Sequence, residues 1–282
     1  MILKKNKMGA LVSYVLSLYY GKNVQLQFPH AFGLKYPPVL HQTITEESIK
    51  KFNEVFVIGD VHGCYDEMME LLQNANALHD STLKIFVGDI VNKGPKNLEV
   101  LTTLRTMTSS LIVRGNHDEV VLREYNKLND PSYIIPPHNL WIKDIPKIDI
   151  DFLNNLPYTL SIPSLNVIIV HAGLVPNLPL HCHHPKDLVT MRNLKLGDYY
   201  GSKLKPTSKN TGEPWASLWT GPEHVYFGHD AKRKLQQFPH ATGIDTGCVY
   251  GNHLTGIFIS GARCGTLLSV KAKKVYEAPS GK

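Results

Sequence analysis

Cysteine is scarce in this chain, and its scarcity narrows the possible classes of protein. The 282 residues contain four cysteines, and no two of them form a Cys-x-x-Cys pair. A disulfide framework needs more cysteines, and a structural zinc site needs closely spaced ligands, so neither is expected. We expect reduced, buried thiols, with a bridge between Cys248 and Cys264 as the alternative.

The chain also lacks a long hydrophobic run and any Asn-x-Ser/Thr glycosylation sequence. Its most apolar stretch, residues 8–20, follows several lysines, which is the outline of a leader or a weak membrane anchor. The stretch is short for a bilayer crossing, and no cleavage site of the A-x-A kind follows it. We therefore expect residues 1–20 to form a docking helix of a cytoplasmic protein, with a membrane-anchored or lumenal protein as the alternative.

Acidic residues are outnumbered in this sequence. Lys and Arg total 30 against 24 for Asp and Glu, which gives a formal net charge of +6. A positive excess favours an anionic partner, such as phosphate, a nucleotide, nucleic acid or an acidic lipid, without selecting among them. The hydrophobic fraction of 43% is that of a globular domain with a substantial core.

From residue 54 onward, short apolar runs alternate with stretches of helical spacing. The apolar runs predict buried strands at 55–58, 83–87 and 111–113. The apolar residues between and after them predict helices at 67–78, 98–107 and 119–128. This alternation is typical of a parallel sheet with right-handed crossovers.

The second half of the chain is less regular. A short helix is expected around residues 150–156, and further buried strands at 167–170 and 225–227. Residues 176–214 are rich in Pro, Gly, Lys and His, and so long an irregular stretch indicates a functional loop. Short strands at 254–259 and 266–270 predict a second sheet packed on the first.

Polar, chemistry-bearing residues follow each predicted strand. The strand ends carry the sequences GDVHG (59–63), GDIVNKG (88–94), RGNHD (114–118), HAG (171–173) and GHD (228–230). Open α/β sheets bind ligands at the carboxyl ends of their strands, so these sequences should converge on one crevice. Because so many desolvated carboxylates and imidazoles need a compensating cation, the set predicts a metal centre.

The ligand types indicate which ions bind there. Asp, Asn and His without thiolates suit borderline divalent ions, so we expect two ions drawn from Mn, Zn, Fe or Co. The candidate ligands are Asp60 and His62 for one ion, Asp89 as the bridge, and Asn116, His171 and His229 for the second ion. Two ions about 3.5–4 Å apart clamp a phosphoryl group and lower the pKa of the water they share, which prepares it for in-line attack.

This series of motifs resembles that of the calcineurin-like metallophosphoesterases, within the phosphoprotein-phosphatase superfamily. The Asn-Lys pair in GDIVNKGP, where protein phosphatases have Asp-Arg, is similar to the ApaH-like branch. The resemblance covers about residues 54–272. It implies an α/β fold of two mixed β-sheets stacked between helices, a four-layer α/β/β/α sandwich. The domain would span residues 53–277, after a linker or wrapping segment at 21–52.

The resemblance also implies roles around the metals. His117 would donate a proton to the leaving group, with Asn92 beside it. Lys93 and Arg192 fall where the family has cationic phosphate-binding residues, although Lys93 lacks the bidentate fork of an arginine. Arg114 precedes GNHD, and both a catalytic and a structural role are open for it. Asn92 can accept a hydrogen bond from the ring, but it cannot stabilise an imidazolium by charge.

We therefore predict a hydrolase of phosphoanhydride or phosphoester bonds that acts on a phosphorylated small molecule or polymer. The candidate substrates are polyphosphate, dinucleoside polyphosphates, nucleotides and a capped RNA end. A Ser/Thr protein phosphatase is the alternative, and the Asn92-Lys93 pair argues against it. A non-catalytic scaffold would have lost metal ligands, whereas every ligand position here keeps a suitable side chain.

Three other features could have either a structural or a functional role. Trp215 and Trp219 are expected in the core, with nucleobase stacking as the alternative. The tract from His181 to His184 is expected on a surface loop, because adjacent residues cannot all face one ion. Four lysines either extend the phosphate site or solvate the loop at 176–214, namely Lys195, Lys203, Lys205 and Lys209.

Overall fold

The computed structural model describes residues 33–278. Residues 1–20, expected to form a docking helix or an anchor, and the first part of the segment 21–52 lie outside this range. Within the described range, no helix is long and apolar enough to cross a membrane.

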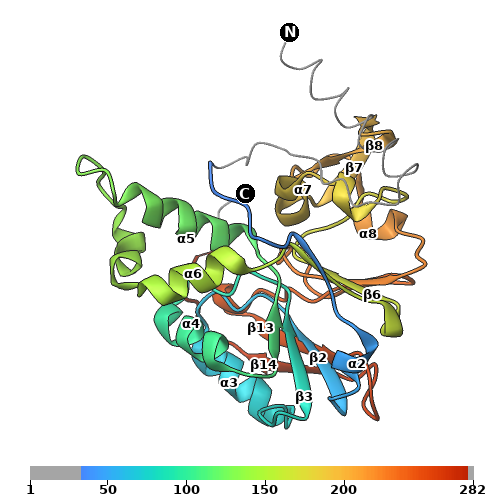
Figure 1. Cartoon of the computed structure of the whole chain (residues 1–282), viewed down its shortest axis with the longest axis horizontal. Coiled ribbons are helices and arrows are strands. Elements are labelled where there is room, and N and C mark those ends of the chain that lie inside the picture. Colours follow the sequence, from blue (N-terminus) through green and yellow to red (C-terminus); the bar gives the residue numbers. More distant parts are fainter. Residues whose placement is uncertain (1–32, 279–282) are drawn as a thin grey trace.

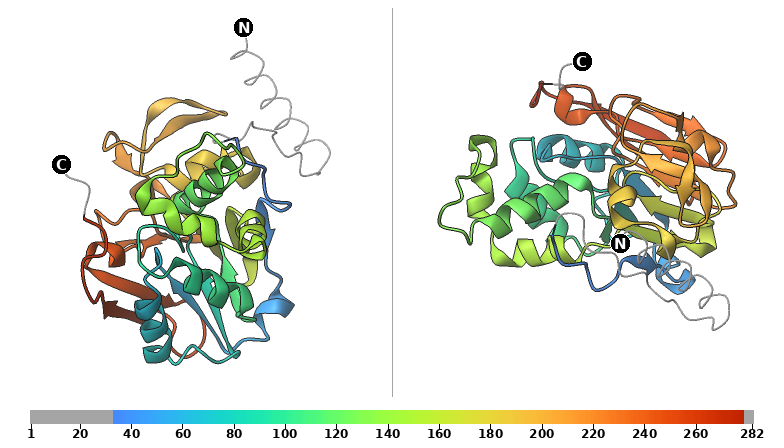
Figure 2. Two further views of the ribbon diagram at one scale, coloured as in Figure 1. Left: turned by 90° about the vertical axis from the view of Figure 1, so that its left-hand side faces the viewer. Right: turned by 90° about the horizontal axis from the view of Figure 1, so that it is seen from above.

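Two mixed β-sheets are stacked face to face, with helices on both outer sides (Figures 1 and 2). The first sheet has the order β14-β13-β2-β3-β4. Its parallel strands are β2 (Glu54–Ile58), β3 (Thr82–Phe86) and β4 (Ser110–Ile112), and its antiparallel additions are β13 (His253–Phe258) and β14 (Leu267–Lys271). The predicted fold, two mixed sheets between helices, is confirmed.

The second sheet has the order β1-β5-β6-β10-β12-β11. Its members are β1 (His41–Thr43), β5 (Thr159–Ile162), β6 (Val167–Val170), β10 (His224–Phe227), β11 (Gln236–Phe238) and β12 (Ala241–Gly243). β6 and β10 run parallel, as do β10 and β12, and β1 pairs in parallel with β5. The described part of the segment 21–52 thus supplies an edge strand and the short helix α2 (Glu46–Ile49).

The alternation of side chains along the strands explains the layers. In β2, Val55 and Val57 face the second sheet and belong to a core shared with Leu160 and Ile169. Phe56 and Ile58 point the other way, into the core under the helices. Both faces of the central strands are therefore buried, which is why they are continuous apolar runs rather than alternating ones.

The helices cover the outer faces of the two sheets (Figure 1). Those that follow the strands of the first sheet and pack in its core are α3 (Tyr65–Asn74), α4 (Asn97–Thr106), α5 (Asn116–Lys127) and α6 (Lys147–Asn155). The second sheet packs against α7 (Pro185–Thr190) and α8 (Trp215–Leu218). Short 3₁₀ turns occur at Pro137–Asp144, Pro163–Leu165, Leu180–Cys182 and Cys248–Tyr250.

Two predictions about the sheets were wrong. The strands near the C-terminus do not form a second sheet, because β13 pairs with β2 and β14 pairs with β13, which extends the first sheet. The stretch 176–214 is not one irregular loop. It contains α7 and a small sheet of β7 (Asn193–Tyr199), β8 (Ser202–Thr207) and β9 (Glu213–Pro214). The β7–β8 hairpin lies at the end of the molecule farther from α3 (Figures 1 and 2).

The cysteine and histidine expectations are partly met. Cys64, Cys182 and Cys248 are buried free thiols, whereas Cys264 is free and exposed. The tract from His181 to His184, which was expected on the surface, is partly buried. His183 lies in the interior and accepts a hydrogen bond from the N–H of Val175 at 2.8 Å. This histidine has a structural role.

Trp215 belongs to the core, as expected. Its side chain is 2% exposed and makes edge contacts with the rings of Trp219 and Phe227. A Cβ at Gly173 would lie 2.5 Å from its indole nitrogen, so the strand-end sequence HAG can only pass beside this ring with glycine there. The indole thus anchors the segment that carries His171.

Truncation of this ring should be costly. We expect Trp215→Ala to lower the free energy of unfolding by about 3–5 kcal/mol, because it removes a large side chain from a packed core. Chemical denaturation of both proteins measures this. Leu196→Ala, at a side chain 88% exposed, is the control and should change stability by less than about 0.5 kcal/mol. Equal stability of the Trp215 variant and the wild type would contradict this placement.

Candidate metal centre and substrate cavity

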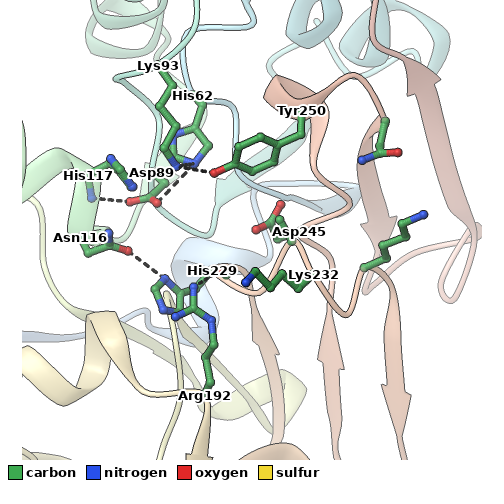
Figure 3. Close-up of a pocket in the computed structure, with 13 residues that line it drawn as sticks. His62, Asp89, Lys93, Asn116, His117, Arg192, His229, Lys232, Asp245 and Tyr250 are labelled. Carbon is green, nitrogen blue, oxygen red and sulfur yellow. Dashed lines mark hydrogen bonds and ion pairs between the residues drawn. The ribbon is translucent and has the colours of Figure 1, made fainter. Parts of the chain in front are cut away.

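The predicted strand-end residues come together, but from two sheets rather than one. Asp60, Asp89 and Asn116 follow β2, β3 and β4 of the first sheet, whereas His171 and His229 follow β6 and β10 of the second. Figure 3 shows these strand ends around one space, with Lys93 and Tyr250 entering from one side and Arg192 from the opposite side. The strand ends therefore converge on one crevice, as expected, and both sheets contribute to it, because β6 and β10 pair with each other and not with β3 or β4.

Asp89 lies at the middle of the cluster. One carboxylate oxygen is 3.5 Å from Nε2 of His62, and the other is 3.4 Å from Nε2 of His171. Burial would raise the pKa of Asp89, but His171, His117 and His62 together lower it well below its usual range. An ionised carboxylate with one oxygen toward each histidine is the arrangement that a bridging ligand needs.

The first group of candidate ligands has its lone pairs directed inward. The Nδ1–H of His62 donates to the backbone oxygen of Val91 at 3.3 Å, which leaves Nε2 as an acceptor. The ammonium of Lys93 lies 3.3 Å from that nitrogen, so a positive charge is already held beside it. Asp60 is buried and accepts from the backbone N–H of His229 at 3.1 Å, which ties the two sheets together at this point.

The second group of candidate ligands converges on the side chain of Asn116. His171 donates from Nδ1 to the oxygen of Val87 (2.8 Å), and His229 donates from Nε2 to the oxygen of Thr190 (3.2 Å). Their other ring nitrogens lie 3.1 and 2.8 Å from Oδ1 of Asn116. Burial lowers the pKa of His229 well below its usual range, so its Nδ1 keeps a lone pair. Burial acts in the same direction on His171, but the neighbouring Asp89 outweighs it and raises the pKa of His171. Converging lone pairs of this kind fit a divalent cation.

The carboxylates of the site point to the same conclusion. Asp60, Asp89, Asp118 and Asp245 are all buried in one region. Burial raises the pKa of Asp60 well above its usual range, and repulsion from Asp245 and Asp89 adds to the effect. Burial likewise raises the pKa of Asp245 to about 6. Divalent cations would relieve this repulsion and keep the carboxylates ionised, and the residues present therefore fit two divalent ions.

Asp118 holds the two strand ends in place, and sequence reasoning assigned it no role. Its carboxylate accepts from the backbone N–H groups of Asp89 and Ile90 (both 3.1 Å) and of Gly115 (2.8 Å). A Cβ at Gly115 would lie 2.3 Å from the backbone nitrogen of Asp89, so only glycine permits this approach. The motif GNHD could have indicated this role, because its glycine permits the close approach of Asp89 and its aspartate accepts hydrogen bonds from the loop after β3.

Asn92 orients His117 in a way that the sequence did not indicate. The Oδ1 atom of Asn92 accepts from the N–H of Lys93 at 2.8 Å, which turns its amide nitrogen toward Nδ1 of His117 at 3.3 Å. An amide nitrogen can only donate, so Nδ1 accepts and the ring proton sits on Nε2. Asn92 thus donates to the ring rather than accepting from it. Burial lowers the pKa of His117 to about 4, which agrees with a neutral ring.

A cavity of about 330 Å³ lies over these residues, and its wall is rich in cations (Figure 3). The cationic residues that line it are Lys93, Arg192, Lys232 and Lys234. Arg192 donates to the backbone oxygen of His229 at 3.2 Å and lies 3.7 Å from Asp230. Asp245, Tyr250 and Asn252 also line the cavity, and none of them was singled out from the sequence. All three lie in the stretch GIDTGCVYGNHLTG at residues 243–256.

Other cationic candidates lie elsewhere. Arg114 is buried, and its guanidinium donates to the backbone oxygens of Leu153 and Asn154 and stacks on Tyr158. Its contacts are structural. The four lysines named in the stretch 176–214 belong to the β7–β8 hairpin and its end, and the cavity described within residues 33–278 is lined by other residues.

Known proteins resemble this chain over most of its length. A family model described as calcineurin-like phosphoesterase matches residues 54–251. The symmetrical bis(5'-nucleosyl)-tetraphosphatase of Coxiella burnetii is 29% identical over 74% of this chain and 89% of its own length. The asymmetrical bis(5'-nucleosyl)-tetraphosphatase PrpE of Oceanobacillus iheyensis is 29% identical over 72% of this chain and 87% of its own.

One solved structure extends the comparison. A crystal structure described as a diadenosine tetraphosphatase superposes with a TM-score of 0.72 and is 33% identical in sequence. The superposition covers 86% of this chain and 100% of the other. The similarity therefore extends over almost the whole of the described domain.

The central carboxylate gives a direct test of the metal centre. We expect Asp89→Asn to abolish turnover and to lower the metal content, because the candidate ligands on both sides lose the charge between them. Elemental analysis should give about two divalent ions per wild-type chain and clearly fewer in the variant. Asp151→Asn, at an exposed carboxylate of α6, is the matched control. Wild-type activity that survives exhaustive chelation would contradict a metal centre.

Proposed function

The chain belongs to the calcineurin-like phosphoesterases, and on that premise we propose that it hydrolyses the phosphoanhydride bonds of dinucleoside polyphosphates. The family makes it a metal-dependent phosphatase or pyrophosphohydrolase. The relatives named above act, by their names, on bis(5'-nucleosyl) tetraphosphates. Their matches span more than 85% of their own lengths, which supports the transfer of this substrate class.

We propose Asp60, His62, Asp89, Asn116, His171 and His229 as the ligands of two divalent ions, from Mn, Zn, Fe or Co. Such ions, when bound, polarise the phosphoryl oxygens and make a nucleophile available at neutral pH. The protein's own contribution is rigidity. Each ligand histidine donates one ring N–H to a backbone oxygen: His62 to Val91, His171 to Val87 and His229 to Thr190. These hydrogen bonds hold each ring in one tautomer in the absence of an ion.

The observation that carries the proposal is the cationic wall of the cavity. Apart from the candidate metal ligands, this wall carries four cationic side chains. Lys93 and Arg192 lie beside the candidate ligands, and Lys232 and Lys234 also line the cavity. Several cationic side chains around one cavity complement the several negative charges of a polyphosphate chain.

The proton arrangement at His117 favours the same substrates. A neutral ring with its proton on Nε2 is a weaker acid than an imidazolium, and the amide of Asn92 does not stabilise the charged ring. A serine alkoxide needs its proton in the transition state, so it would be served poorly. A departing nucleotide phosphate has a second pKa of about 6 and leaves without that help. The hydrogen bonds around Asn92 therefore support anhydride substrates over phosphoserine.

A substrate panel tests the proposed function. We expect kcat/KM to be highest for diadenosine tetraphosphate, when it is compared with inorganic tripolyphosphate, capped RNA and a phosphoserine peptide. The measurement should be repeated with Mn, Zn, Fe(II) and Co, because the ligand set does not select one of them. A preference for the phosphopeptide over every anhydride would overturn the proposal in favour of a protein phosphatase.

A change at Asn92 should shift the preference within that panel. In Asn92→Asp a carboxylate oxygen faces Nδ1 of His117, so the ring can carry both protons and donate more strongly. We expect the ratio of phosphopeptide to diadenosine tetraphosphate turnover to rise about tenfold.

The control is Asn92→Ala, which removes the hydrogen bond without adding charge and should lower both activities together. An unchanged ratio in the Asp variant would mean that proton donation from His117 does not set the substrate preference.

A further inference from the structure

A second cavity adjoins the one over the candidate metal centre. It has a volume of about 350 Å³ and shares Lys234 and Asn252 with the first cavity. Its wall is built from the end of β13, from β14 and from the segment after β10, with Leu235, Leu267, Thr255 and Ser269 among its lining residues. No sequence motif indicates this cavity, because its lining residues come from three separated parts of the chain.

A directed chain of hydroxyl groups runs through this wall. Thr246 donates to the backbone oxygen of His253 at 2.6 Å, and a carbonyl can only accept. The proton of Thr246 is therefore used, so the hydroxyl of Thr255, 2.7 Å away, must donate to it. By the same argument, Ser269 donates to Thr255 at 2.8 Å. Each hydroxyl proton in this series is thus directed away from Ser269 and toward the backbone oxygen of His253.

This direction determines which ligand atoms the wall can bind. Ser269 is exposed, its proton is committed to Thr255, and its oxygen presents free lone pairs to the cavity. It therefore binds a hydrogen-bond donor. Phosphate oxygens at neutral pH only accept, whereas the hydroxyls of a ribose can donate. The hydroxyl wall thus selects a sugar over a further phosphate.

The other walls agree with a nucleoside. Leu235 is 38% exposed, and it lines the cavity together with Leu267, so the pocket offers apolar surface to a base. At the boundary with the first cavity, Lys234 is exposed, and Lys232 lines the first cavity nearby. Within residues 33–278 neither ammonium has an ion pair with a carboxylate, which leaves both for phosphate oxygens.

We propose that the second cavity binds the nucleoside at the far end of a dinucleoside polyphosphate. The phosphate chain runs from the candidate metal centre past Lys232 and Lys234, and the ribose donates to Ser269 while the base lies against Leu235 and Leu267. This inference rests on the proposed function. It assigns to the second cavity the contacts that distinguish a dinucleoside polyphosphate from inorganic polyphosphate.

Two substrates separate the nucleoside contact from the phosphate contacts. Diadenosine tetraphosphate and inorganic tetraphosphate have the same number of phosphates, but only the first has nucleosides. We expect Ser269→Ala to raise the ratio of their KM values, dinucleotide over inorganic, about fivefold through loss of one hydrogen bond. Ser269→Tyr, which fills the cavity, should raise it at least tenfold. Lys234→Ala should raise both KM values and leave the ratio nearly unchanged.

Thr266→Tyr is the matched control, because Thr266 is exposed just before β14 and outside both cavities. It should keep the wild-type kinetics with both substrates. An unchanged ratio in both Ser269 variants, with dinucleotide hydrolysis intact, would overturn the nucleoside site and leave the proposed function standing. A wild-type enzyme that cleaves inorganic tetraphosphate but not the dinucleotide would overturn both.

Discussion

The cluster of buried carboxyl groups around Asp89 is the constraint that the rest of the structure has to accommodate. Four buried aspartates lie where the strand ends of two sheets meet, and burial alone makes such a cluster unfavourable. The fold holds it together with backbone N–H groups, most of them directed at Asp118, and with the N–H of His229 directed at Asp60. The left-handed backbone at Asp89, with φ of 49°, is part of the same arrangement. Cations bound at this point would offset the repulsion between these carboxylates.

The sequence predicted the ends of strands better than their partners. A buried strand followed by Gly-Asp or His-Ala-Gly is a local pattern, so β2, β3, β6 and β10 were located within about one residue. The pattern of β6, an apolar run with both faces covered, is the same as that of β2, and nothing local assigns them to different sheets. For the same reason β13 and β14 were expected in a sheet of their own. Strand pairing is decided by contacts between distant residues, such as Phe56 with Phe258.

The residues that were missed act through neighbours that are distant in sequence. Asp118 supports a loop that precedes it by more than 25 residues, and Asp245 reaches the cluster from beyond β12. The helix α5 begins at Asn116, earlier than its apolar pattern indicated, because Asp118 binds the N–H of Gly115 and starts the first turn there. That early start places Asn116 and His117 in the first turn of a helix, where their positions are fixed.

Asn92 and Lys93 form one unit, and this explains why they differ together from the Asp-Arg pair of the protein phosphatases. Both residues have positive φ angles, 78° and 71°, a region in which asparagine is tolerated better than most side chains. The N–H of Lys93 determines which end of the Asn92 amide faces His117, while the ammonium of Lys93 lies between His62 and Tyr250. With aspartate in place of Asn92, both side-chain ends would accept, and the proton on His117 would move to Nδ1. One amide therefore sets the direction of a hydrogen bond at the proposed proton donor, and that direction matters most when the leaving group is basic. An enzyme whose leaving groups are phosphates loses little by this substitution.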